Sequence, residues 1–245
     1  MKKKLHFQSN FAIIKCHYYL LKIVRATGES IDPSTAVLVE LTTIKRGRCC
    51  EMGKTDIFEA AKYIVALHFI ANNRYTCNRT KVEKLLSIAD LILIKNGSRL
   101  FPNTPIFINA CGIGYCVLAQ DASLFPMDNI ISVSNEGSRD KGSEIMLDRK
   151  NEKAVPDAYK TTSIDSNTKH LLESVFLKFG AFTAKEIGTL MDEFKGRIQS
   201  TEQNSDNLKY YVDAEKAKAF FESDCEILRT NLLAAFIVSY TISHV

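Results

Sequence analysis

The pattern of apolar and polar positions predicts a helix over residues 80–95, the most strongly patterned stretch of the chain. Apolar side chains recur there at helical spacing, and the second half of the segment is apolar on nearly every side. Thr80 and Glu83 have the spacing of a capping box. Asn96-Gly97 is typical of a helix end, because glycine adopts the left-handed conformation without a Cβ penalty. A helix with so much apolar surface is expected to lie at the centre of the fold.

The residues after this helix are expected to return to the core. Leu100 and Phe101 are apolar and follow the predicted helix end directly. Pro102 and Pro105 then exclude further helix, since proline has no backbone N–H to donate. The segment 105–118 is apolar and partly β-branched, which indicates a short strand or an irregular buried segment.

A second helix is predicted from Asp56 to Asn72. Asp56 and Glu59 again have capping-box spacing, and apolar residues recur at helical intervals as far as Ala71. His68 lies beside this apolar stripe. No other ligand-type residue stands at ligand spacing from it, so we interpret His68 as a core or boundary residue.

Two more helices are predicted at 166–180 and 183–194. Ser166 or Asn167 is the expected cap of the first, and Thr183 with Glu186 forms a capping box for the second. Two helices joined by a tight turn have the outline of a helix-turn-helix. The second helix offers Lys185 and Lys195 against Glu186, Asp192 and Glu193, and this acidic excess disfavours contact with DNA phosphates. We therefore predict a packed antiparallel pair.

The remaining segments are less regular. Residues 120–168 are rich in turn-forming residues and predict a small hairpin or a loop, where partner contacts would first be sought. Residues 198–209 are polar and predict a loop. A last helix is expected from Asp213, leading into an apolar tail over 231–245. This tail is shorter than the ~20 residues that cross a bilayer, so packing on the core or on a partner is expected.

The central segment also resembles a known family. A K-x-x-K-L-L run, a stretch of mostly apolar residues, a G-x-x-L-F run and a later glycine are similar to the Panacea domain, a SocA-like, phage-associated antitoxin family. The preceding segment 58–67 resembles the first helix of that family, and 170–194 resembles its closing helices. The residues of this chain that match the motif are Lys81, Lys84, Leu85, Leu86, Gly97, Leu100, Phe101 and, more loosely, Gly112.

This chain departs from the family pattern at two points. It has Cys111-Gly112-Ile113-Gly114 where the family often has Gly-Pro-Val, and Ser87 where an aromatic residue often follows K-L-L. The resemblance implies an antitoxin or adaptor of a mobile genetic element, which binds a toxin partner or directs it to a protease. It implies no catalytic, cofactor-binding or metal-binding residue, and the motif positions are expected to be mostly structural.

Length and charge set the domain organisation. The 245 residues are 46% hydrophobic, enough for a full core. We expect a mainly α fold with a minor β-hairpin or short strands, divided into a basic extension (1–54), a helical domain (55–197) and a C-terminal part (198–245). Residues 1–54 hold ten basic and four acidic residues, a charge of +6, and the rest carries −2. An alternative function is therefore a nucleic-acid-binding regulator that uses this basic leader.

Motifs of catalysis and metal binding are absent from the sequence. Seven cysteines occur at irregular spacings, without a C-x-x-C pair, and Lys15, His17 and Lys22 interrupt the apolar run that a signal peptide needs. We expect free thiols in the cytoplasm, no metal and no cofactor. Gly112 and Gly114 lack the third glycine of a dinucleotide site, since Val117 stands there. A second alternative is an enzyme whose site is assembled from distant residues, and the oligomeric state is not predicted.

Overall fold

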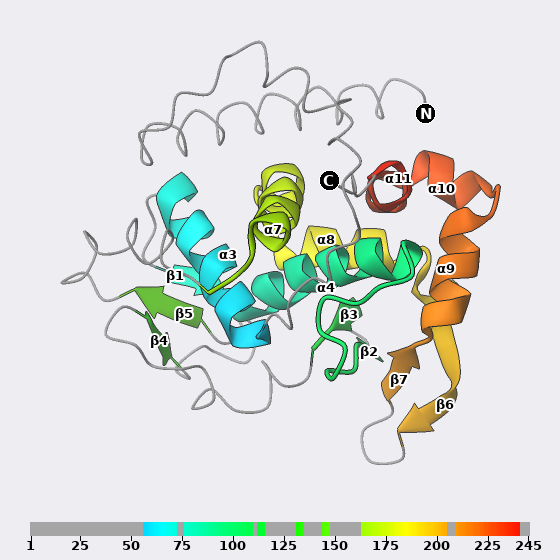
Figure 1. The fold of residues 1–245 in the computed structure, drawn as a ribbon, viewed down its shortest axis with the longest axis horizontal. Helices are drawn as coiled ribbons and strands as arrows, with labels where there is room; N and C mark the ends of the chain where they lie inside the picture. The colour runs from blue at the N-terminus through cyan, green and yellow to red at the C-terminus, as the bar shows by residue number, and fades with distance from the viewer. Residues whose placement is uncertain are drawn as a thin grey trace, which may run out of the picture.

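The computed structural model describes a mainly α fold with two small antiparallel sheets (Figure 1). This confirms the fold class predicted from the sequence. The basic leader, and most of the turn-rich segment 120–168, lie outside the described residues. The residues that the structure describes are 56–72, 76–109, 112–115, 131–134, 144–147, 163–204 and 209–240.

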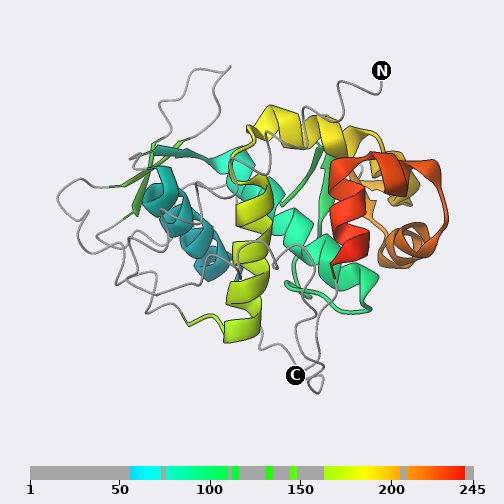
Figure 2. The same ribbon diagram turned by 90° about the horizontal axis from the view of Figure 1, so that it is seen from above.

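The helix α4 (Arg79–Lys95) is the centre of the fold, as its apolar pattern predicts. Every residue from Lys81 to Ile94 is buried. In Figures 1 and 2 the other helices surround it. The helices that pack directly on it are α3 (Ile57–Asn72), α7 (Ser166–Phe179), α8 (Ala184–Asp192), α9 (Ala214–Glu222) and α11 (Leu232–Ser239).

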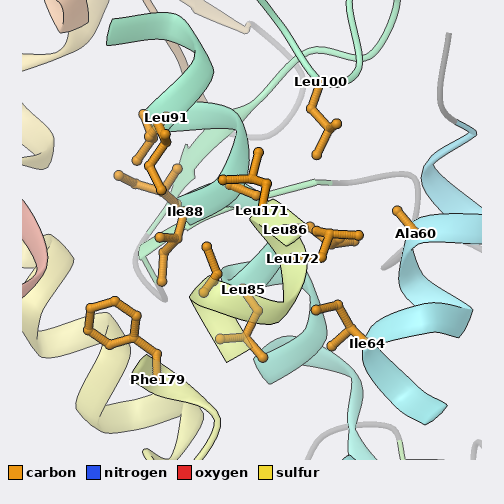
Figure 3. Packing of buried hydrophobic residues seen from close by; sticks show 14 of the residues in the cluster. Ala60, Ile64, Leu85, Leu86, Ile88, Leu91, Leu100, Leu171, Leu172 and Phe179 are labelled. Atoms are coloured by element: carbon orange, nitrogen blue, oxygen red, sulfur yellow. The ribbon is translucent and has the colours of Figure 1, made fainter. Parts of the chain in front are cut away.

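The core around α4 is built from aliphatic side chains of three helices (Figure 3). Leu85 and Leu86 of α4 lie in one cluster with Ile64 of α3 and Leu172 of α7, and all four are at most 1% exposed. Burial of such side chains is worth about 1.5–3 kcal/mol each. The two leucines of the K-L-L run therefore hold α4 between its neighbours.

Two sheets of short strands complete the described fold. One has the order β1-β5-β4 and contains the hairpin predicted within 120–168. The other has the order β3-β2-β7-β6, and its β3 strand packs on α4 and α8. The strands are β1 (Thr76–Asn78), β2 (Phe107–Asn109), β3 (Gly112–Gly114), β4 (Ile131–Ser134), β5 (Glu144–Leu147), β6 (Gln199–Asn204) and β7 (Lys209–Val212).

The loop predicted at 198–209 was wrong for most of its described residues, because residues 199–204 form β6 and residue 209 begins β7. The strand β6 is polar, and Thr201 is exposed, so no apolar alternation reveals it. Long-range contacts fix it instead. The strand β7 pairs with both β6 and β2, and the rings of Tyr211 and Phe107 lie 4.9 Å apart. Such tertiary pairing overrides the weak local preference.

Two predicted helix caps were also wrong. Asn78 caps α4, accepting a hydrogen bond from the Lys81 backbone at 3.1 Å, so Thr80 lies inside the first turn. Asp165 caps α7, one residue before the predicted Ser166. In both cases a short polar side chain just upstream reaches the free amides better than the predicted residues inside the helix do. The capping box of Thr183 and Glu186 is confirmed.

The helices after residue 166 differ from the prediction in two ways. The helices α7 and α8 lie crosswise and pack chiefly on other elements, so the predicted antiparallel pair was wrong (Figure 2). The single C-terminal helix expected from Asp213 is three short helices, α9, α10 (Glu226–Thr230) and α11. The breaks coincide with residues that favour caps, since Asn231 starts α11 with its side chain.

Candidate functional site

A buried carboxylate lies in the otherwise apolar second half of α4. The side chain of Asp90 has no exposed surface. It accepts hydrogen bonds from Nε of Arg99 at 3.0 Å, from the backbone N–H of Leu100 at 2.7 Å and from the hydroxyl of Tyr115 at 2.7 Å. The charge of Asp90 is therefore compensated by an ion pair and two further donors, as a buried charge requires.

The guanidinium group of Arg99 extends these bonds into the chain that follows α4. Its Nη2 donates to the carbonyl of Phe101 at 3.2 Å and to that of Thr104 at 2.8 Å. We call the four residues Asp90, Arg99, Leu100 and Tyr115 the Asp90 clamp. The clamp links the helix α4, the segment 96–105 and the residue that follows β3.

Two ionisable groups of the clamp have shifted pKa values. Burial raises the pKa of Tyr115 well above its ordinary value, and the nearby charge of Asp90 raises it further. Burial opposes the charge of Arg99, but the hydrogen bond and the charge of Asp90 outweigh it and raise its pKa. At neutral pH the clamp therefore holds a charged guanidinium and a neutral phenol.

The segment 96–105, which we call the 96–105 loop, has a buried centre and an exposed surface. Leu100 and Phe101 are each 2% exposed, which confirms that they return to the core. The Phe101 ring meets the Tyr115 ring edge to face, with centroids 5.4 Å apart. The exposed residues of the loop are Asn96, Gly97, Ser98, Pro102, Asn103 and Pro105.

The loop begins at the predicted helix end. Gly97 has a φ of 77°, the left-handed conformation expected of it. Its N–H donates to Ile94, and the N–H of Ser98 donates to Leu93, both at 2.9 Å. This pair of bonds is the Schellman motif, which satisfies the last carbonyls of a helix.

The basic motif residues lie at the other end of α4. Nζ of Lys81 donates to the backbone carbonyl of Gly180 at 2.5 Å and so joins α4 to the end of α7. Lys84 is 3% exposed, and its Nζ would lie 2.6 Å from a Cβ at Gly112. Beside them, Nε of Arg79 lies 3.5 Å from a carboxylate oxygen of Glu83. The basic residues of this end are thus turned into the structure.

The motif residues therefore fall into three sets. Leu85 and Leu86 lie in the core. Gly97, Leu100 and Phe101 shape the loop. The lysines join α4 to other segments, Lys81 through the Gly180 carbonyl and Lys84 against Gly112. The sequence analysis missed the Asp90 clamp. Its signal was an aspartate in the half of the helix that is apolar on nearly every side, followed by an arginine shortly after the helix end. A charge in such a position needs a partner, and Arg99 is the nearest basic residue after the loop begins.

Comparison with protein-family models, with curated proteins and with solved structures found no match. The resemblance to the Panacea domain thus stands on the motif residues alone.

Other groups within the described residues were considered as sites. His68 is 8% exposed, and its ring lies beside Phe69 and Phe176, with the Asn72 amide 3.1 Å from Nδ1. Its position agrees with the core or boundary role predicted for it. No group of three His, Cys, Asp or Glu side chains within the described ranges could hold a metal ion. None of the described helices has the length and apolarity needed to cross a bilayer.

The buried polar side chains of α4 make hydrogen bonds that hold other segments of the chain in place. The carboxylate of Asp90 and the ammonium of Lys81 both bond to backbone groups of distant segments. These bonds fix the exposed surface beside α4, because a carbonyl or amide that is held from inside cannot reorient freely. The arrangement therefore suits the presentation of a fixed surface.

Proposed function

We propose that this protein is an antitoxin-like or adaptor protein of a mobile genetic element, which acts in the cytoplasm by binding a toxin partner. The match of its motif residues to the Panacea domain supports this assignment. The geometry supports the mode of action, since the matched residues build a helical frame around α4 with a fixed loop at one end. It acts by binding, not by catalysis.

The observation that carries the proposal is the bonding of the buried Asp90 side chain to the 96–105 loop, whose surface is exposed. A buried ion pair is no better for stability than apolar residues of the same volume. In some proteins such a pair is kept because it selects one conformation. Here the pair selects the conformation of the 96–105 loop, because Asp90 and Arg99 are bonded to the backbone of Leu100, Phe101 and Thr104. A surface fixed before binding loses less entropy when a partner docks.

The action of the frame on the toxin follows from general interface physics. Affinity would come from a few well-packed anchors and specificity from the polar rim around them. The antitoxin either covers the functional surface of the toxin or holds the toxin for a protease. Both routes begin with the same complex.

The experiment is co-expression with the product of the neighbouring gene. The proposal predicts that this product stops growth when expressed alone, that the present chain restores growth, and that the two proteins co-purify in a fixed ratio. Rescue that is lost in a protease-deficient host would indicate the adaptor route. No rescue together with no complex would refute the proposal.

A salt series separates this function from nucleic-acid binding by the leader. Binding to phosphates weakens steeply as salt rises, because counterions are released. Affinity for duplex DNA that depends on residues 1–54 and falls with salt would favour the regulator instead. Rescue by a chain lacking residues 1–54 would favour the antitoxin.

A further inference from the structure

The helix α3 is covered on two opposite sides. Ala60 has no exposed surface and lies on the side that faces the core (Figure 3). Phe69 follows Ala60 by about two and a half turns and therefore lies on the opposite side of the helix. Phe69 is nevertheless only 6% exposed, and the side chain of Lys62 is 17% exposed, which is low for a lysine. We call this opposite side the outer face of α3, and its residues are Phe58, Lys62, Val65 and Phe69.

The outer face is covered by the chain itself, because these exposed fractions are those of a single chain. Among the described elements, those that pack chiefly on α3 are α4, α7 and β1. The helices α4 and α7 contribute Leu86 and Leu172 to the side of Ala60, and β1 follows the C-terminal end of α3. The outer face therefore requires a further apolar segment of the chain.

The basic leader contains a segment with the pattern that such a face requires. Apolar residues recur in 12–25 at positions i, i+7 and i+11, which predicts a helix with an apolar stripe and a basic opposite side. The stripe consists of Ile13, Leu20, Leu21 and Val24, and the basic side consists of Lys15, Lys22 and Arg25. Neither 116–130, which contains Pro126, nor 148–162, which is mostly polar, offers a comparable stripe.

We propose that residues 12–25 form a helix whose apolar stripe packs on the outer face of α3. Residues 26–55 are long enough for this connection, since they can extend over ~90 Å, whereas α3 is ~24 Å long. In this arrangement Lys15, Lys22 and Arg25 face solvent, so the positive charge of the leader lies beside α3. The inference goes beyond the proposed function and does not depend on it, because it concerns a contact within one chain.

The test uses the full chain, which contains no tryptophan. Phe69→Trp therefore gives a single fluorescent reporter on the outer face. Its emission should lie at short wavelength, and acrylamide should quench it weakly, because the face is covered. Adding Leu20→Glu places a charge in the apolar stripe, so the emission should shift to longer wavelength and the quenching should increase. The matched control is Lys22→Glu, the same new side chain on the basic side, which should leave both readings unchanged.

Hydrogen exchange measures the same cover without the reporter, so the test does not depend on how position 69 accepts a larger ring. The amides of α3 should exchange about tenfold faster in Leu20→Glu than in Lys22→Glu, because an uncovered helix opens more readily. If neither the reporter nor the exchange responds to Leu20→Glu, the inference is overturned. A reporter that is exposed before the leader is changed overturns it as well.

Two other occupants of the apolar stripe give distinct results. If the quenching of the reporter depends on protein concentration, the leader covers a second copy of the chain. If the full chain binds vesicles of anionic phospholipid, and Leu20→Glu abolishes that binding without changing the reporter, the stripe is a membrane anchor. Either result overturns the proposed contact within one chain and leaves the proposed function untouched.

Discussion

The ammonium group of Lys84 lies where a side chain at Gly112 would have to go. A Cβ built at Gly112 would be 2.6 Å from Nζ of Lys84, closer than real Cβ contacts allow. Lys84 lies in the N-terminal half of α4, and Gly112 opens β3, so the pair joins the central helix to the second sheet. Gly112 also has a φ of 111°, which other residues rarely adopt. The backbone conformation therefore favours glycine at this position, and any side chain there would also have to displace the end of the Lys84 side chain.

Gly112→Ala is expected to destabilise the protein by about 1–3 kcal/mol, from backbone strain and from displacement of the lysine. Urea unfolding followed by circular dichroism measures this change. The matched control is Gly196→Ala, because Gly196 has an ordinary φ and no neighbour within 4 Å of its built Cβ. The control should change the free energy of unfolding by about 0.5 kcal/mol or less.

The double variant Lys84→Ala with Gly112→Ala separates the two constraints. Removing the lysine relieves the contact and leaves the strain in φ. The double variant should therefore cost less than the sum of the two single variants, by about 0.5 kcal/mol or more. Strict additivity would show that the contact with Lys84 contributes nothing.

Local pattern was sufficient to predict α4 and its end. The apolar residues from Val82 to Ile94 form one stripe that widens to nearly the whole helix surface in the second half, and Gly97 follows with the conformation that ends a helix. Both signals act within a few residues along the chain. The start of the helix was harder, since Asn78 and Thr80 are both capping residues and only their positions in space decide between them.

Asp90→Asn is expected to cost about 3–5 kcal/mol, because it leaves Arg99 partly buried without a counter-charge. The substitution preserves the shape of the side chain, so the loss of stability measures the contribution of the negative charge. Hydrogen exchange should accelerate at the amide of Leu100, which donates to Asp90 at 2.7 Å. Urea unfolding measures the first effect, and exchange followed by NMR measures the second.

Asp192→Asn is the control for this prediction. Asp192 pairs with Lys195 at 2.6 Å, but the two side chains are 49% and 28% exposed. An exposed pair contributes about 1 kcal/mol or less, since water screens it. If Asp90→Asn and Asp192→Asn lower the free energy of unfolding equally, burial does not strengthen the ion pair of the Asp90 clamp.

The candidate site could not be assembled from the sequence, because its parts lie on separate segments. Asp90 and Arg99 are close along the chain, but Tyr115 reaches them only after β2 and β3 turn the chain back. The strand β6 was missed for a similar reason, since its pairing with β7 sets its conformation. Contacts of this kind leave no periodic signal in the local sequence.

Tyr115→Phe is expected to change how stability depends on pH. The folded protein raises the pKa of Tyr115, whereas the unfolded chain ionises it near pH ~10. The contribution of the neutral phenol is therefore complete below pH ~10 and is lost as the pH rises toward the folded pKa. The variant should be less stable at pH ~7 by about 1.5–3 kcal/mol, the value of a hydrogen bond to a charged group.

Above pH ~10 the stability of the wild type should fall more steeply than that of the variant, by about 1.4 kcal/mol per pH unit. Denaturant unfolding at neutral and alkaline pH measures both curves. Only their difference is interpreted, because other tyrosines titrate in both proteins. Parallel curves would contradict an elevated pKa at Tyr115.

Asn231→Ala is expected to loosen the C-terminal helix α11. The side chain of Asn231 accepts hydrogen bonds from the amides of Leu233 and Ala234 at 3.0 and 2.9 Å. It also donates to the carbonyl of Leu190 at 2.8 Å and to the carboxylate of Glu193 at 2.9 Å. Losing both the cap and the bonds to Leu190 and Glu193 should cost about 2 kcal/mol or more, measured by thermal unfolding.

Asn231→Asp separates the role of this side chain as the cap of α11 from its role as a donor to Leu190 and Glu193. Aspartate keeps the acceptor that caps α11, but it replaces the donor with an oxygen that faces the Leu190 carbonyl and the Glu193 carboxylate. Because like partial charges repel at this distance, the Asp variant should be at least as unstable as the Ala variant at neutral pH. If Asn231→Asp has wild-type stability, capping alone accounts for Asn231, and its bonds to α8 and Glu193 contribute nothing measurable.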